Sequence, residues 1–108
     1  MPWYQYPSYF LAGIFAANAI PHFVSGMMGR AFQSPFATPR GEGLSSSTVN
    51  VLWGAFNAAL AYLLIYRVGS FDIRLTADAG AVGLGALLMA VLASRLFGRF
   101  HGGFPDAG

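Results

Sequence analysis

The chain has 108 residues, of which 56% are hydrophobic and only 9% are charged, with six arginines, no lysine and a formal charge of +2. An average soluble domain carries roughly 25% charged residues, and a small one needs them because much of its surface is exposed. The high hydrophobicity also excludes an intrinsically disordered chain, and the scattered arginines form no basic stripe for nucleic acid. The composition therefore predicts one integral membrane domain, residues 1–108.

Three apolar segments each approach the length of about 20 residues that a helix needs to cross a hydrocarbon core. They cover residues 9–28, 48–66 and 77–97, with loops at 29–47 and 67–76 and a short C-terminal tail. The third has no polar side chain between Ala79 and Ala93, and a chain this small cannot bury three such helices in protein. We expect an all-α fold: a transmembrane bundle of three helices with a long ordered loop between the first two.

The first two segments carry polar side chains at helical spacing. Asn18, His22 and Ser25 share one face of the first helix, and Asn50 and Asn57 share one face of the second. An amide or imidazole in hydrocarbon needs a partner, so we expect Asn18 and His22 to face Asn57. These residues either hold the helices together by hydrogen bonds or line a path for protons or a substrate, because imidazole titrates near neutral pH.

No cofactor is predicted, and two candidate sites rest on single features. A haem could use His22 as an axial ligand, but the chain has no second histidine at span depth, so bis-histidine ligation would need a second copy. A copper site could combine His22 with Met27 and Met28, since thioethers suit Cu(I), although adjacent methionines face different ways. Because no carboxylate pair, zinc-protease motif or phosphate-binding glycine motif occurs, we do not expect an enzyme.

The first loop is longer than the 2–8 residues usual between neighbouring helices. Phe32 and Phe36 provide apolar anchors, and the prolines stiffen the backbone, so we expect an ordered loop that lies back on the helices. Its charged residues Arg30, Arg40 and Glu42 are expected to contact lipid headgroups, each other or a partner protein.

Helix starts are also readable. Ser46 or Ser47 is predicted to cap the second helix and Thr76 the third. Asp78 then falls in the first turn of the third helix, where the helix dipole stabilises a carboxylate. We therefore expect Asp78 to support the helix start rather than to carry protons.

Small residues recur at four-residue spacing and allow helix backbones to approach closely in lipid. The candidates are Gly54 in the second segment and Ala81, Gly83, Gly85, Ala86 and Ala90 in the third. They pack either within the chain or between chains, so we expect a homo-oligomer or a larger membrane protein complex in the lipid bilayer.

The string PHFVSG…FQSPFATP…GLSS…VNVLWG, within residues 20–54, resembles the signature of a family of small, uncharacterised bacterial integral membrane proteins. The resemblance implies a bacterial membrane, expected here to be the inner membrane, and implies no activity, cofactor or partner. The arginine bias predicts an outside N-terminus and an inside C-terminus, because four arginines flank one side of the spans and two the other: Arg30, Arg40, Arg95 and Arg99 against Arg67 and Arg74.

These observations predict a small non-enzymatic membrane protein that serves as an accessory or assembly subunit of an oligomeric complex. The alternative is a small transporter or channel protomer with a polar path at Asn18, His22 and Asn57. A third hypothesis is a haem- or metal-binding redox subunit that uses His22.

Overall fold

A computed structural model describes residues 3–104, which form three long helices and one small hairpin. Each helix is long and apolar enough to cross a membrane, which indicates a membrane location and confirms the predominantly helical class. The helices are α1 (Gln5–Met27), α2 (Ser47–Tyr66) and α3 (Thr76–His101). Between α1 and α2, the short strands β1 (Phe32–Gln33) and β2 (Leu44–Ser45) pair antiparallel, with Phe32 opposite Ser45. The sequence pattern did not predict this hairpin.

The helix ends differ from the expected spans at two places. α1 begins four residues earlier than expected, so the aromatic residues near its start belong to its first turns. Pro7 is tolerated there because the first-turn N–H groups have no partner within the helix. α3 continues through His101 and ends at Gly102, which adopts the left-handed conformation (φ 78°) typical of a helix C-terminus.

The start of α2 follows the expected capping chemistry, and the start of α3 does not. The Ser46 hydroxyl accepts a hydrogen bond from the Val49 N–H at 3.2 Å, as an N-cap serine does. The expectation for Thr76 is wrong: Thr76 is the first helical residue, and the capping position is taken by Leu75, which has no side-chain oxygen to offer.

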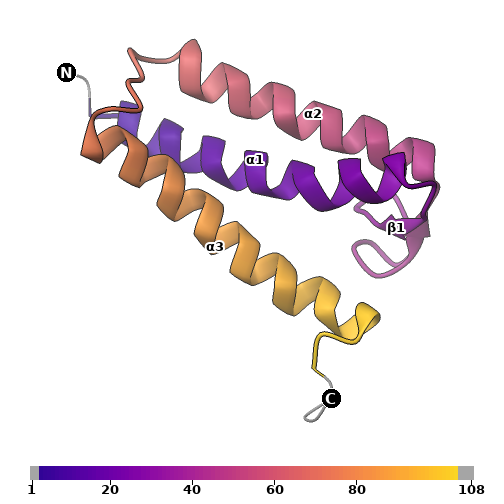
Figure 1. Cartoon of the computed structure of the whole chain (residues 1–108). Helices are drawn as coiled ribbons and strands as arrows, with labels where there is room; N and C mark the ends of the chain where they lie inside the picture. Colours follow the sequence, from indigo (N-terminus) through magenta and orange to yellow (C-terminus); the bar gives the residue numbers. More distant parts are fainter. Residues whose placement is uncertain (1–2, 105–108) are drawn as a thin grey trace.

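α1 is the central helix of the fold. It packs against both α2 and α3, which flank it and scarcely touch each other (Figure 1). As a result, 28% of the residues in the apolar 18-residue stretch of α1 are buried, against 22% in that of α2 and only 6% in that of α3. The arrangement therefore leaves most apolar side chains of α3 exposed or only half-buried within the chain.

Glycines set the distance between α1 and its neighbours. A Cβ atom added at Gly85 would overlap the Phe10 carbonyl oxygen, and one at Gly13 would overlap the Val82 carbonyl oxygen. On the other side of α1, a Cβ at Gly54 would lie 2.7 Å from the backbone nitrogen of Phe23. Since these obstacles are backbone atoms, larger residues at these three positions would push the helices apart.

We predict that Gly85→Ala lowers the unfolding free energy in detergent by about 1–3 kcal/mol, because the methyl group has no room against α1. Gly83→Ala is the matched control, two residues away on the same helix, where an added Cβ has no neighbour within 4 Å. It should be neutral or stabilise by up to about 1 kcal/mol, since alanine favours helix over glycine. Equal losses for the two variants would contradict the glycine-limited packing of α1 and α3.

Candidate functional site

Four polar side chains between α1 and α2 form two hydrogen-bonded pairs, together called the polar seam: Asn18 with Asn57, and His22 with Asn50. Asn18 Nδ2 donates to Asn57 Oδ1 at 3.1 Å, and Asn57 Nδ2 donates to the Trp53 carbonyl at 2.8 Å. One turn further along, His22 Nδ1 lies 2.8 Å from Asn50 Oδ1. Asn50 and Asn57 are fully buried and His22 is 2% exposed, so these bonds form away from solvent.

Asn50 links the seam to the first loop. Its Nδ2 lies 3.1 Å from the Phe32 carbonyl, 3.2 Å from the Ser45 carbonyl and 3.1 Å from the Ser46 carbonyl. Because all three neighbours are acceptors, this atom is the amide nitrogen, and Oδ1 accepts the proton carried by His22 Nδ1. One side chain therefore joins α1, β1, β2 and the start of α2, and it selects the tautomer of His22.

Aromatic rings surround His22 and extend the contact to α3. Its imidazole makes edge contacts with Phe32, Trp53 and Phe97, at centroid distances of 5.4, 6.4 and 5.7 Å. Phe32 in turn stacks on His101 with centroids 5.1 Å apart and planes 10° from parallel. This sequence of rings connects α1, the hairpin and the C-terminal part of α3.

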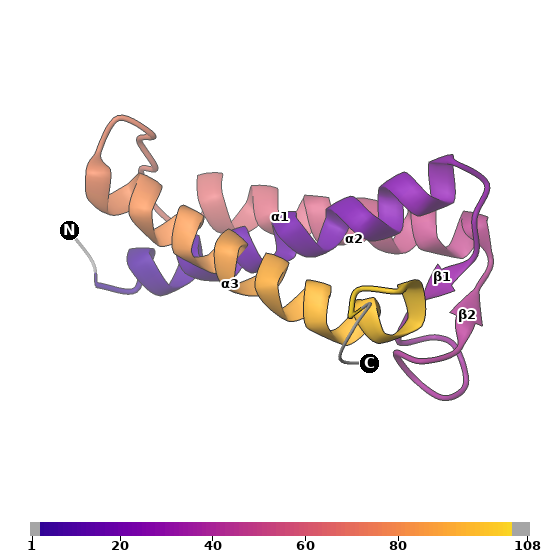
Figure 2. The ribbon, with the colours of Figure 1, turned by 60° about the horizontal axis from the view of Figure 1, so that its bottom comes forward.

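The contact between the hairpin and the last turns of α3, the hairpin clasp, comprises Phe32, Gln33, Phe97 and His101. Figure 2 shows the hairpin beside this end of α3. His101 Nε2 lies 2.8 Å from Gln33 Oε1, and Gln33 is buried. The sequence did not predict Gln33, Phe97 and His101 as contacts, because the third helix was expected to end at residue 97 and a contact between the loop and that end leaves no local pattern. The aromatic and basic residues after residue 97, Arg99, Phe100 and His101, were the signal that could have indicated a longer helix.

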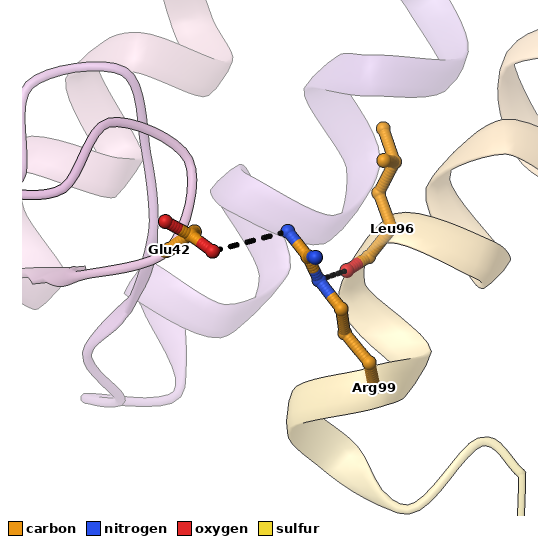
Figure 3. Close-up of polar contacts among 3 residues, drawn as sticks. All are labelled: Glu42, Leu96 and Arg99. Atoms are coloured by element: carbon orange, nitrogen blue, oxygen red, sulfur yellow. Dashed lines mark hydrogen bonds and ion pairs between the residues drawn. The ribbon is translucent and has the colours of Figure 1, made fainter. Parts of the chain in front are cut away.

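An ion pair lies at the edge of the clasp. Arg99 reaches Glu42 of the loop at 3.5 Å and donates from Nε to the Leu96 carbonyl at 3.2 Å (Figure 3). Both charged side chains are about half exposed, so their attraction contributes about 1 kcal/mol or less. The half-buried rings of Phe32 and Phe97 and the buried Gln33, rather than this pair, hold the hairpin against α3.

The remaining loop and span residues of interest lie nearer the surface. Ser25 is half-buried and its carbonyl accepts the Arg30 N–H at 2.9 Å, while the Arg30 and Arg40 side chains are exposed. Phe36 is exposed but packs edge-on against Trp53, with centroids 5.1 Å apart.

The small residues of α3 divide between two faces. Gly85 contacts Phe10, and a Cβ added at Gly13 of α1 would lie 2.7 Å from the Ala86 nitrogen. Ala81 is half-buried, whereas Gly83 has open space beside it and Ala90 is exposed along a groove between α1 and α3. One part of the stripe therefore packs within the chain and another faces outward.

The surroundings of His22 do not fit the two suggested cofactors. Its Nδ1–H is bound to Asn50, which is the arrangement of many metal-ligating histidines, but three aromatic rings enclose the imidazole. A planar macrocycle on Nε2 would displace these rings. Met27 and Met28 are each more than 60% exposed, whereas His22 is buried, so the copper ligands are not gathered around one position.

A polar path finds no support in the grooves of the described chain. The α1–α2 groove, of about 520 Å³, has alanine, glycine and apolar side chains along it. A second, of about 450 Å³, lies between α1 and α3, and a third, of about 520 Å³, lies beside Trp53. Asn18, His22, Asn50 and Asn57 line none of the three; they bond to one another and to backbone groups instead.

No protein-family model, curated protein or solved structure matches the chain. The resemblance of residues 20–54 to a bacterial membrane family therefore gains no support, and function rests on the geometry alone.

We predict that Asn50→Leu lowers the unfolding free energy by at least about 2 kcal/mol, because each buried group left without a partner costs about 1–3 kcal/mol. Hydrogen–deuterium exchange should also accelerate at the amides of residues 32–45, since Asn50 holds both strands. Asn18→Ala is the control: this half-buried residue makes one hydrogen bond within the seam, so the loss should be about 1 kcal/mol or less. An unchanged exchange rate in Asn50→Leu would show that the hairpin does not depend on the seam.

Proposed function

We propose that this protein is a non-enzymatic accessory or assembly subunit of an oligomeric membrane complex, with α3 as its assembly surface. The polar seam and the hairpin clasp have the character of structural contacts, because their polar side chains bond to one another and to backbone groups. The transporter and redox alternatives lack a comparable supporting observation.

The observation that carries the proposal is the uncovered apolar surface of α3. Leu84 and Leu87 are each more than 60% exposed, and open space lies beside Gly80 and Gly83. In lipid, glycines of this kind let the backbone of a second helix approach closely, and lipid tails pack less well into the same space.

The proposed location is the bacterial inner membrane with the hairpin and the end of α3 inside. Four arginines belong to that end of the molecule: Arg30, Arg40, Arg95 and Arg99. Two, Arg67 and Arg74, belong to the α2–α3 turn at the opposite end. Excess arginine favours the cytoplasmic side.

We predict that Gly83→Ile weakens self-association or capture of a partner by at least tenfold, because the side chain would occupy the space into which another helix fits. Among the described residues, an added Cβ at Gly83 has no neighbour within 4 Å, so the fold should persist. The measurement is the oligomer distribution in nanodiscs by mass photometry, with partners retained by gentle extraction. Ala59→Ile, at an exposed small residue of α2, is the matched control and should assemble normally.

A monomeric wild-type protein that co-purifies with no other protein would contradict the assembly role. Transport activity lost in His22→Ala, with assembly intact, would favour the transporter alternative instead.

The orientation is testable because the chain has no cysteine. A membrane-impermeant maleimide added to intact cells should label Ser70→Cys in the α2–α3 turn. It should label Ala31→Cys, in the first loop, only after the membrane is permeabilised. The reverse pattern would place the hairpin outside.

A further inference from the structure

A second polar cluster lies at the end of the molecule opposite the hairpin, where α1 begins, α2 ends and α3 begins. It comprises Gln5 and Tyr9 of α1 and Asp78 of α3, and we call it the end cluster. Tyr9 and Asp78 are fully buried and Gln5 is 6% exposed. Neither the polar seam nor the proposed assembly surface uses these residues.

Each of the three side chains has one buried oxygen atom without a hydrogen-bond partner among the described residues. These atoms are Gln5 Oε1, the Tyr9 hydroxyl and Asp78 Oδ1. The other carboxylate oxygen, Asp78 Oδ2, accepts the Asp72 N–H at 3.0 Å. Unpaired buried polar atoms are few in a native protein, so three in one cluster require an explanation.

The turn from Gly69 to Asp72 brings the three residues together. The Gln5 side chain packs on Gly69, where an added Cβ would lie 2.5 Å from Gln5 Nε2. Phe71 packs edge-on against Tyr9 with centroids 5.0 Å apart, and Asp72 binds Asp78. All three side chains thus lie under one four-residue segment.

The negative charge of Asp78 is the strongest constraint on which partner could bind the unpaired oxygen atoms of this cluster. Among residues 3–104, no arginine or histidine reaches Asp78 within ion-pair distance, and the nearby Arg67 and Arg74 are exposed. A position in the first turn of α3 stabilises a carboxylate, but this effect is smaller than the cost of burying an unpaired charge. A counter-charge at Oδ1 would remove that cost.

We propose that the end cluster is a binding site for a monovalent cation, Na⁺, held by Asp78 Oδ1, Gln5 Oε1 and the Tyr9 hydroxyl. Oxygen atoms are the ligands that hard cations prefer, and here they comprise one carboxylate, one amide carbonyl and one phenol. The single negative charge matches a monovalent ion. Ca²⁺ sites take six to eight oxygens with several carboxylates, and no group of three acidic or histidine side chains occurs in the described chain.

The bound ion would join the start of α1 to the start of α3, in addition to the contact of Gly85 with Phe10. It would also fix the α2–α3 turn through Asp72 and Gly69. Occupancy would therefore change the stability of the α1–α3 contact, and that is the property to measure.

The test is thermal unfolding of the purified full chain in detergent, with NaCl replaced by choline chloride at constant ionic strength. Choline is too large to enter the cluster, so it controls for screening. We expect NaCl to raise Tm by about 5 °C when Na⁺ exceeds its dissociation constant tenfold or more. Sodium-23 NMR should show line broadening that the protein causes and that excess Li⁺ reverses.

Asp78→Asn, which keeps the size of the side chain, should abolish both the Tm rise and the line broadening. Tyr9→Phe keeps the contact with Phe71 and should weaken Na⁺ binding about tenfold, so it provides a second variant if Asp78→Asn unfolds. Asp72→Asn is the matched control, because this exposed carboxylate accepts only the Arg74 N–H of its own turn, at 2.9 Å. It should retain the full Na⁺ response.

Equal Tm values in NaCl and choline chloride, or a Na⁺ response that survives in both Asp78→Asn and Tyr9→Phe, would overturn the proposal. A response to Ca²⁺ but not to Na⁺ would overturn the assignment of a monovalent ion. Because none of these measurements depends on α3 binding a partner, they leave the proposed assembly role to its own test.

Discussion

The rest of the structure depends on one constraint: a buried amide or carbonyl group in an apolar surrounding must find a hydrogen-bond partner within the protein. Asn50 meets this constraint for several elements at once. Its amide nitrogen donates to carbonyl groups of β1, β2 and the residue that caps α2, and its oxygen accepts the His22 N–H. Without this side chain, carbonyl groups of Phe32, Ser45 and Ser46 would lose this hydrogen-bond donor.

The same constraint explains why the hairpin also contacts α3. Once Asn50 positions Phe32, the ring lies between His22 and Phe97 and against His101, so the end of α3 is held at the side of the hairpin. Elsewhere α3 meets α1 through glycine contacts. Most of its apolar surface is left without protein cover, which is the basis for the proposal that this helix serves assembly.

Sequence reasoning reached the residues whose signal is local. Helical spacing placed Asn18 and His22 on one face and Asn50 and Asn57 on another, and the structure has both polar pairs across the α1–α2 contact. It expected Asn57 as the partner of both α1 residues, but His22 meets Asn50, because antiparallel helices pair later residues of α1 with earlier residues of α2. The Thr76 cap was wrong because a serine or threonine near a helix start does not show which residue begins the helix. Gln33 and His101 were missed because they meet across 68 positions of sequence.

By itself, the sequence determined the class of the protein: composition and apolar segment length depend only on residue type and order, and they lead to three helices fit for a membrane. It also determined which side chains could not remain alone in hydrocarbon. The tertiary structure decided which partners they found, that α1 is central, and that Gly85 faces inward while Gly83 faces outward. It likewise brought Gln5, Tyr9 and Asp78 under one turn. The physical reason is that helical periodicity specifies a face but not its neighbour, and the neighbour is set by close backbone approach and by the pairing of buried polar groups.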